Sequence, residues 1–526
     1  MPDQGPPAGT FGALIRLGAR RTPRLTAVKM LGGRSVSYAE LDDRTDRLAN
    51  ALLAQGLEPG DRVAAWMEDQ VEYVELYVAV AKAGLVIAPI NSRLQPAEAT
   101  YQLTDSGARA LAWTAALTGR VAELDDELTG GLVRISTDPD ADALAFEDLV
   151  NKGHGPPAPE PDPDALFIIG YTSGTTGRPK GAMLTHRSVL AIARLNAISY
   201  RLSMLSVLAL TGSMSFVAVV PAHIVCHFYL GGTIVILGAW DVEGLIDTIE
   251  AERVTFTYMP SPLILDFAEA ARRRPKPWAG LQTMLHSASK ADPAKVQALV
   301  DVIGDRFVEG LGMTENSGGL ITATTRDDVL GRSEAADLFA SVGRPVCESA
   351  VRIAGSDGEA VAQDGSEVGE IVMTSPALMS GYWNQPEESA RALRDGWYRS
   401  GDLGWMDPAG YVYVTERRTD LIVTGGMNVY PSEVEQSIVT LADVAECAVV
   451  GIPHERWGQT VAAVVVRAAG SEVSAEAIVE HCRRNLAGYK KPTQVVFVDS
   501  LPKTASLKVR RSEVRKLFAS ISTKRL

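Results

Sequence analysis

Hydrophobic positions in the first 150 residues alternate between helix-like and strand-like spacing. Leu41, Leu48 and Leu52 recur on one helical face, and Gly84 follows a second apolar helix where a left-handed C-cap is expected. Short apolar runs between these helices predict buried strands. Alternation of this kind is typical of a parallel, doubly wound sheet covered by helices. The helices are expected over 38–56 and 71–82, and the strands over 61–66 and 85–88.

The pattern changes at three later points in the chain. Residues 153–163 are rich in proline and glycine and predict a surface linker. Short apolar runs between 343 and 413, punctuated by glycine and aspartate, favour antiparallel sheet. Beyond about Thr419 a second unit of strands and helices begins. We therefore predict two domains, 1–418 and 419–526.

No charged side chain occurs between Arg201 and Asp241. A membrane-spanning helix needs about 20 mostly apolar residues, and this stretch is interrupted by Pro221, His227 and the pair Gly231–Gly232. Buried strands and a buried helix explain the stretch better, so we expect no integral membrane segment.

Composition and charge exclude some function classes. A chain of 526 residues is too long for one compact core. A net charge of -13 argues against nucleic acid as a main partner, because phosphate binding needs a basic face. The four cysteines lie far apart, with no metal-binding or disulfide spacing. No apolar signal run precedes Thr10, and a cytoplasmic protein with reduced thiols is expected.

The strongest local signal is the run Tyr171-Thr-Ser-Gly-Thr-Thr-Gly-Arg-Pro-Lys-Gly181, directly after the apolar run 166–169. Glycines let backbone N–H groups wrap an anion, and hydroxyls and a lysine add donors. The pattern is not a P-loop, because Pro179 stands where that motif requires its second glycine. A flexible surface loop is the alternative, which so many donors after a buried strand disfavour. The expected phosphate ligands are Thr172, Ser173, Gly174, Thr175, Thr176 and Lys180.

This loop resembles the signature of the adenylate-forming superfamily, which holds acyl-CoA synthetases, adenylation domains of peptide synthetases and luciferases. Further segments resemble that superfamily's motifs in the same order along nearly the whole chain, and the closest type is the acyl-CoA synthetases. These segments are Ser37-Tyr-Ala-Glu-Leu41, Pro59-Gly-Asp-Arg-Val63, Lys82-Ala-Gly84, Gly312-Met-Thr-Glu315, Trp397-Tyr-Arg-Ser-Gly-Asp402, 417–420, Gly425-Gly-Met-Asn-Val-Tyr-Pro431, Glu433-Val-Glu435 and Leu501-Pro-Lys-Thr-Ala-Ser506 leading to Lys508.

The resemblance implies an α/β fold. A large N-terminal domain of doubly wound α/β subdomains carries a small distorted β-barrel, and a small mobile α+β domain follows. In the superfamily the small domain rotates between two half-reactions, adenylation of an acid and thioester formation. The matching hinge positions are Thr419 and Asp420, and hinges are often such element-terminal residues.

The resemblance also assigns catalytic roles. Lys508 matches the lysine that bridges the substrate carboxylate and the α-phosphate, although it also sits in a basic tail where an exposed lysine would be ordinary. Glu315 should hold Mg²⁺, and Thr314 should bond the α-phosphate. Asp402 should accept bonds from the ribose hydroxyls, and Arg417 should reach the ribose or the phosphates. A helix-start carboxylate, a turn aspartate and a surface salt bridge are the respective structural alternatives.

The remaining cofactor contacts follow from the same matches. Gly425 and Gly426 should lie where pantetheine passes close to the backbone, although a hairpin turn would also need glycine there. The expected cofactors are ATP or AMP, Mg²⁺ and coenzyme A. The other expected nucleotide contacts are Ser287, Ala288, Ser289, Gly310, Leu311, Gly312 and Met313.

Some positions depart from the superfamily pattern. Leu311 replaces an aromatic residue that is frequent next to the central glycine, and Leu507 replaces the glycine before the C-terminal lysine. Residues 287–290 and 213–216 also differ from the usual motifs. These departures suggest a second hypothesis, an enzyme that performs mainly the thioester step on a preformed acyl adenylate.

Other functions share the same motifs. A stand-alone activator could load a carrier protein, a luciferase-like oxidation is a rarer outcome, and a non-catalytic nucleotide-binding relative is disfavoured by the retained motif residues. The expected substrate is a hydrophobic monocarboxylic acid or its acyl adenylate, because the predicted pocket offers no evident cation for a second carboxylate. A homodimer is compatible with the resemblance. The expected pocket residues are Phe216, Val217, Pro221, His223 and Ser317.

Overall fold

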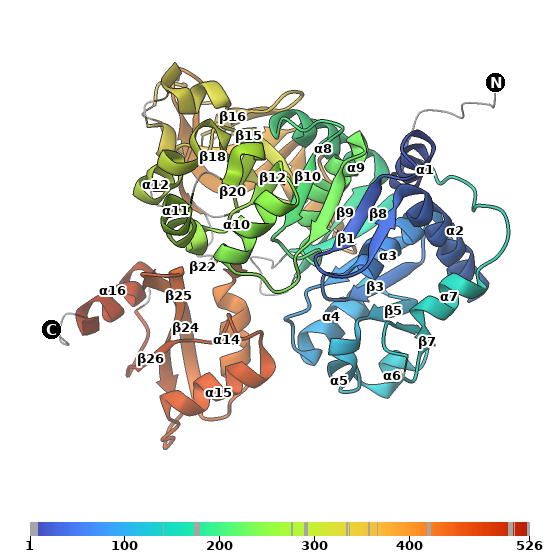
Figure 1. Cartoon of the computed structure of the whole chain (residues 1–526). Coiled ribbons are helices and arrows are strands. Elements are labelled where there is room, and N and C mark those ends of the chain that lie inside the picture. The colour runs from blue at the N-terminus through green and yellow to red at the C-terminus, as the bar shows by residue number, and fades with distance from the viewer. Residues whose placement is uncertain are drawn as a thin grey trace.

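The computed structural model describes residues 9–522 with short gaps. Figure 1 shows a large body built from the blue-to-yellow part of the chain and a smaller orange-to-red lobe beside it. The gaps are 140, 173–178, 275–276, 289–292, 333–334, 336, 356–357, 366, 418–421, 503–508 and 510.

The first layer is a seven-stranded sheet with the order β7-β6-β5-β3-β4-β8-β9. All neighbours are parallel except β8 and β9, so the doubly wound prediction is confirmed. Its strands are β3 (Arg62–Trp66), β4 (Val86–Ile90), β5 (Ala110–Trp113), β6 (Val133–Ser136), β7 (Leu144–Ala145), β8 (Leu166–Thr172) and β9 (Lys180–Thr185). The accompanying helices are α1 (Phe11–Arg21), α2 (Tyr38–Ala54), α3 (Val71–Lys82), α4 (Pro96–Ser106), α5 (Thr118–Val121), α6 (Asp126–Thr129) and α7 (Phe146–Lys152).

Both faces of this sheet are buried. Along β3, Val63 and Ala65 pack into the core shared with α2 and α3, whereas Ala64 and Trp66 pack into a separate core with α4. Successive side chains of a strand point to opposite faces, so a strand covered on both sides must be apolar throughout. This explains the short, continuous apolar runs in the sequence.

The second layer is a nine-stranded sheet with the order β16-β15-β14-β13-β12-β10-β11-β1-β2. Its central strands, from β14 to β1, are parallel, so their carboxyl ends share one edge. The strands are β1 (Thr26–Met30), β2 (Ser35–Ser37), β10 (Val207–Leu210), β11 (Thr233–Ile236), β12 (Phe256–Tyr258), β13 (Thr283–His286), β14 (Phe307–Gly312), β15 (Leu320–Ala323) and β16 (Arg344–Pro345). The helices are α8 (His186–Ser199), α9 (Cys226–Leu230), α10 (Val242–Ala251), α11 (Ile264–Arg272) and α12 (Pro293–Ile303).

The uncharged stretch after Arg201 folds inside this layer. It forms β10, a π-helical turn over Val220–Val225, α9 and β11, all largely buried. Among the described residues, no helix is long and apolar enough to cross a membrane.

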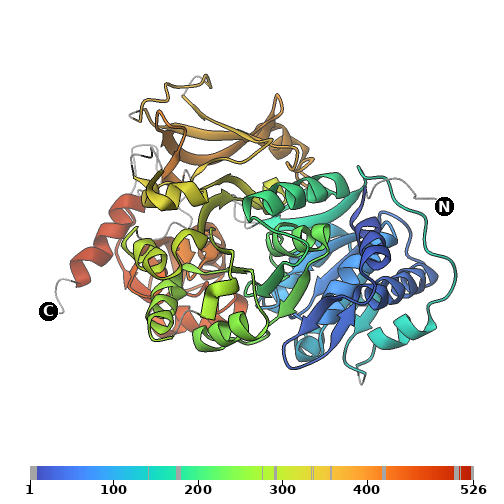
Figure 2. The same cartoon turned by 45° about the horizontal axis from the view of Figure 1, so that its top comes forward.

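The segment with antiparallel character forms a third sheet, in which β20 pairs with β18, β19 and β21. Figure 2, which brings the top of the molecule forward, shows this yellow-to-orange sheet standing above the other layers. The sheet is open rather than closed, because β17 and β21 are not joined to each other in the described chain, so the expected small barrel is only partly formed. The elements are β17 (Ala350–Ala354), β18 (Gly369–Thr374), α13 (Pro386–Ala392), β19 (Leu393–Arg394), β20 (Trp397–Met406) and β21 (Val412–Arg417).

The C-terminal lobe is a small α+β unit whose five-stranded sheet is antiparallel except for the pair β25–β26. Val449 and Val461 pack on one face against α14 and α15, and Val450 and Val464 pack on the other against α16. Its elements are β22 (Ile422–Thr424), β23 (Met427–Val429), α14 (Pro431–Val439), β24 (Val444–His454), β25 (Gly458–Arg467), α15 (Ala475–Asn485), β26 (Gln494–Phe497) and α16 (Arg511–Ser522). The expected boundary at 418/419 falls outside the described residues.

Candidate functional site

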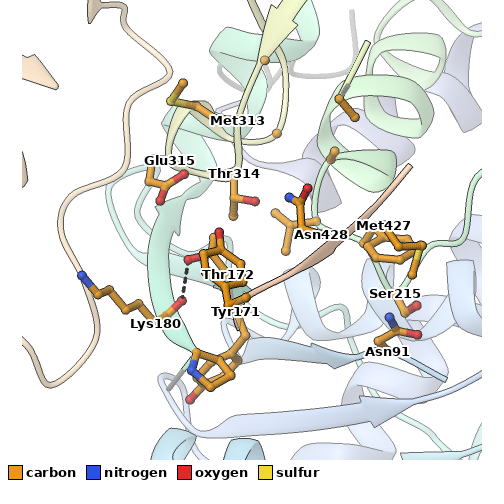
Figure 3. A pocket seen from close by; sticks show the side chains of 18 of the residues that line it. Asn91, Tyr171, Thr172, Lys180, Ser215, Met313, Thr314, Glu315, Met427 and Asn428 are labelled. Atoms are coloured by element: carbon orange, nitrogen blue, oxygen red, sulfur yellow. Dashed lines mark hydrogen bonds between the residues drawn. The ribbon is translucent and has the colours of Figure 1, made fainter. Parts of the chain in front are cut away.

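A cleft of about 1060 Å³ lies between the large body and the C-terminal lobe. It runs along the carboxyl ends of β10, β12, β13 and β14, passes β8, β9 and β20, and meets the turn between β22 and β23. In open α/β sheets ligands bind outside the carboxyl ends of the strands, and this cleft has that position. Figure 3 shows part of its lining.

Glu315 is held in the cleft by a tyrosine that the motif comparison missed. The Tyr382 hydroxyl donates to Glu315 Oε1 at 2.8 Å, and the Tyr398 hydroxyl lies 3.4 Å from that of Tyr382. Burial and the Glu315 carboxylate raise the pKa of Tyr382 well above its usual value, so this donor keeps its proton. Thr314 lines the cleft beside Glu315 (Figure 3). The Tyr382 hydroxyl thus holds the Glu315 carboxylate at the cleft.

Lys180 reaches the cleft but carries a carboxylate partner. Its Nζ lies 2.7 Å from Glu388 Oε2 on α13, and 5.3 Å from the centre of the Tyr382 ring. The bond from Lys180 lowers the pKa of Glu388. An incoming phosphate would compete with Glu388 for the three N–H donors of this lysine. Thr172, at the end of β8, donates to the Lys180 carbonyl at 3.4 Å (Figure 3).

The two expected ribose residues face each other across one strand pair. Asp402 on β20 lines the cleft and is opposite Arg417 in the antiparallel register of β20 and β21. The two residues are 15 positions apart in the sequence, and the turn between β20 and β21 brings them opposite each other. The ladder thus brings two motifs, which the sequence shows as separate, to opposite positions of neighbouring strands.

The Gly425–Gly426 pair forms a two-residue hairpin turn at the mouth of the cleft. Both residues have positive φ, +58° and +79°, which side-chain-bearing residues rarely adopt. Gly425 donates its N–H to the Trp457 carbonyl at 2.9 Å, and an added Cβ would lie 2.9 Å from the Trp457 ring. The following Met427 and Asn428 also line the cleft (Figure 3). The hairpin therefore requires these glycines and presents them at the site.

A buried ion network fixes the C-terminal lobe against the large body. Lys490 Nζ lies 2.6 Å from both Glu98 Oε1 on α4 and Glu433 Oε1 on α14, and the Ala487 N–H donates to Glu98 Oε2 at 2.9 Å. Burial opposes the charge on Lys490 more than any single partner favours it, but Glu433, Tyr489 and Glu98 together outweigh burial, and the pKa of Lys490 is raised. Burial raises the pKa of Glu433. Lys490 is thus an interdomain contact and not an exposed cation for a nucleotide.

The acid end of the cleft contains only part of the expected set. Phe216, Val217 and His223 line it, whereas Pro221 and Ser317 do not. Pro221 is buried within the π-helical turn, and Ser317 is buried with its hydroxyl donating to the Ala377 carbonyl at 2.8 Å. Sequence reasoning missed Tyr200 and Tyr258, which also line this end.

The other expected nucleotide contacts divide in the same way. Ser287, Ala288, Gly312 and Met313 line the cleft, whereas Gly310 and Leu311 do not. Leu311 is half-buried, packs against the main hydrophobic core and is not among the residues that line the cleft. The expected residues Ser173, Gly174, Thr175, Thr176, Ser289, Thr419, Asp420 and Lys508 lie outside the described residues, as does the side chain of Arg417.

The described residues fit a loosely held magnesium ion rather than an all-protein metal cage. They contain no group of three or more metal-ligating side chains, and Glu315 is a carboxylate that lines the cleft. Mg²⁺ is usually bound by one or two carboxylates together with substrate phosphates and water. Glu315 would be its protein ligand.

Comparisons with known proteins agree with this geometry. The family model described as AMP-binding enzyme matches residues 15–383, and the model described as AMP-binding enzyme C-terminal domain matches 433–508.

Among curated proteins, a feruloyl-CoA synthase of Amycolatopsis is 38% identical over 95% of this chain and 97% of its own length. The long-chain-fatty-acid–CoA ligase FadD13 of Mycobacterium tuberculosis is 33% identical over 97% and 99%. Among solved structures, the amide bond synthetase McbA of Marinactinospora thermotolerans has a TM-score of 0.87, 28% identity and coverage of 97% and 99%. A double mutant of o-succinylbenzoate CoA synthetase of Bacillus subtilis, bound with a product analogue, has a TM-score of 0.83, 25% identity and coverage of 95% and 97%.

Proposed function

This chain belongs to the AMP-binding enzyme family, and we propose that it is an ATP-dependent acid–CoA ligase for a hydrophobic carboxylic acid, acting through an acyl adenylate. The two family-model matches confirm the family resemblance that the sequence motifs indicated. Two relatives are named as CoA ligases, one for feruloyl and one for long-chain fatty acids, which supports the class of reaction and leaves the acid open.

One observation carries the proposal. The same cleft is lined by the nucleotide residues Thr314, Glu315 and Asp402 and by the Gly425–Gly426 hairpin of the C-terminal lobe. The turn itself requires glycine at both positions, and it leaves the backbone beside the nucleotide residues without side chains. A thiol on a long, narrow arm could approach such a backbone closely.

The first half-reaction joins two anions. A carboxylate oxygen of the acid forms a bond to the α-phosphorus of ATP, and the bond to the bridging oxygen breaks as pyrophosphate leaves. Catalysis is mostly positioning and charge neutralisation. Thr314 would bond the α-phosphate, Asp402 the ribose hydroxyls and Lys180 the outer phosphates. Mg²⁺ bound at Glu315 would neutralise phosphate charge.

The second half-reaction moves the acyl group to sulfur. The thiolate of coenzyme A forms a bond to the carbonyl carbon, the bond from that carbon to the phosphate oxygen breaks, and AMP leaves with the electron pair. The thiol proton goes to solvent. The hairpin at the cleft supports an arrangement suited to this step, and Lys508 would act in the first step after a rotation about 419–420. We propose the domains 1–418 and 419–526 on that basis.

The thioester-only alternative keeps the differences at Leu507, 287–290 and 213–216, and the difference at Leu311 supports it less. Leu311 packs against the core and is not among the residues that line the cleft, so its aliphatic character gives less reason to expect weak adenine binding. The neighbouring Gly312 and Met313, which do line the cleft, keep the family motif. The complete two-step reaction is therefore the better proposal.

The test separates the two half-reactions and the acceptors. The protein is incubated with a panel of aryl and fatty acids, ATP, Mg²⁺ and coenzyme A, and in parallel with the matching acyl adenylates. Mass spectrometry of acyl-CoA in both arms is the expected result. Product from the adenylates alone would support the thioester-only enzyme. Product only when a carrier protein or an amine replaces coenzyme A would refute the choice of acceptor.

A further inference from the structure

Two polar side chains at the acid end of the cleft have no hydrogen-bond partner in the described structure. The His223 ring, 7% exposed, and the Tyr200 hydroxyl, on a residue 1% exposed, both belong to residues that line the cleft. Neither polar group is among the buried atoms sealed away from solvent. Leaving a buried donor or acceptor without a partner is unfavourable if nothing replaces the lost water.

The neighbouring Tyr258 provides a contrast. Its hydroxyl donates to the Ser287 carbonyl at 3.3 Å, so its polar group is already satisfied by the protein. The Tyr258 side chain therefore contributes an apolar ring face, while Tyr200 and His223 contribute open polar groups. The difference marks one part of the cleft as built for a polar ligand group.

These groups sit within a cluster of rings. The His223 ring centre lies 6.2 Å from that of Tyr200, 5.5 Å from that of Phe256 and 6.0 Å from that of Tyr258. Ring clusters at such distances favour flat aromatic partners in edge-to-face or offset contact. A flexible alkyl chain would fill the same space without using either polar group.

The imidazole of His223 is uncharged at neutral pH. Burial, together with the nearby His227, lowers the pKa of His223 to about 3. A neutral imidazole has one donor nitrogen and one acceptor nitrogen, and a tyrosine hydroxyl can also do either. The matching ligand group is one that both donates and accepts without carrying a charge, which describes a hydroxyl.

We propose that the acid is a hydroxyaryl carboxylic acid, whose ring hydroxyl, remote from the carboxyl group, is recognised by His223 and Tyr200. This inference rests on the proposed function and narrows its hydrophobic acid to a phenolic one. Sites that hydrogen-bond a substrate hydroxyl reject the analogue that lacks it, because their own polar groups are then left unpaired.

The test compares 3-(4-hydroxyphenyl)propenoic acid with 3-phenylpropenoic acid and with dodecanoic acid. The wild-type protein should show at least about a tenfold higher kcat/KM for the hydroxylated acid than for its unsubstituted analogue. His223→Phe and Tyr200→Phe should each reduce that ratio, the histidine variant to within about threefold of unity. Tyr258→Phe, which removes a hydroxyl already bonded to the protein, is the matched control and should keep the wild-type ratio.

A binding measurement keeps this proposal separate from the proposed function. The two aryl acids are also prepared as non-hydrolysable acyl-sulfamoyl adenosines, and their affinities are measured by calorimetry with all four proteins. If no thioester forms but the affinity ratio follows the predicted pattern, the ligase proposal fails and the hydroxyl site stands. Equal affinities of the wild-type protein for both compounds, or an unchanged ratio in His223→Phe, would overturn the hydroxyl site.

Discussion

Glu98→Ala should selectively slow the thioester half-reaction. Glu98 belongs to the buried ion network between the large body and the C-terminal lobe. Its carboxylate accepts one hydrogen bond from Lys490 Nζ at 2.6 Å and one from the Ala487 N–H at 2.9 Å. Lys490 keeps its second partner, Glu433, which belongs to the same lobe. The substitution therefore weakens docking of the lobe without leaving a buried lysine unpaired.

The magnitude follows from those two bonds. Hydrogen bonds to charged groups contribute about 1.5–3 kcal/mol, and water replaces part of this when the lobe separates. We expect docking to weaken by about 2 kcal/mol, which is roughly a 30-fold shift in its equilibrium. Glu98 also accepts the Gln95 N–H in the capping box of α4. That bond is present whether or not the lobe docks, so its loss lowers overall stability but cancels from the docking equilibrium.

The assay follows each half-reaction separately. Thioester formation from a preformed acyl adenylate should fall by up to about 30-fold in Glu98→Ala, whereas ATP–pyrophosphate exchange should not fall. The matched control is Glu40→Ala, because Glu40 has the same place in the capping box of α2, and its side-chain hydrogen bonds in the described structure go to Ser37. Thermal unfolding of both variants measures how much stability is lost with the capping-box hydrogen bond. Thioester rates of Glu98→Ala within twofold of Glu40→Ala would refute the docking role.

Three further predictions concern the cleft and its surroundings. Glu388→Gln should lower the KM for ATP severalfold, because Lys180 no longer exchanges a carboxylate partner for phosphate; an unchanged KM would mean that Lys180 does not contact the phosphates. Glu315→Gln, or removal of Mg²⁺ with EDTA, should lower ATP–pyrophosphate exchange by at least about 100-fold while sparing thioester formation from a preformed adenylate; equal losses in both steps would contradict the metal role. His186→Phe should remove a pH dependence of stability. Burial lowers the pKa of His186 to about 4, and both ring nitrogens lie without a partner beside Phe167. The free energy of unfolding of the wild-type protein is therefore full above pH 6.5 and falls by roughly 3 kcal/mol as the pH drops toward 4. Denaturant unfolding at several pH values measures the difference between the two proteins, which should be absent if His186 titrates normally.

The elements and the nucleotide motifs were predictable because their signals are local. The helix over 71–82 has the bounds given by its apolar spacing, and α2 begins where Ser37 and Glu40 form a capping box. The motif residues Thr314, Glu315 and Asp402 line the cleft because each follows or belongs to a strand whose position the fold determines.

The contacts that modify the site were not predictable in this way. Lys180 and Glu388 are 208 residues apart, and Glu98 and Lys490 are 392 apart. A charged residue in isolation gives no sign of such a partner, since a surface position explains it equally well. Whether the third sheet closes into a barrel could not be predicted either, because strand patterning gives the alternation of side chains between the two faces but not which strand edges pair.

The case of Leu311 shows how backbone direction changes the meaning of a substitution. The sequence places it next to the central glycine, where an aromatic residue would be expected to pack on adenine. In β14 successive side chains point to opposite faces, and Leu311 is half-buried against the core and does not line the cleft. The cleft is formed instead by Gly312 and the residues after it, where the strand ends. A departure from a family motif therefore weakens a site only if its side chain faces the ligand. Among the described residues, the set that lines the acid end of the cleft differs from the predicted set more than the set that lines the nucleotide end does.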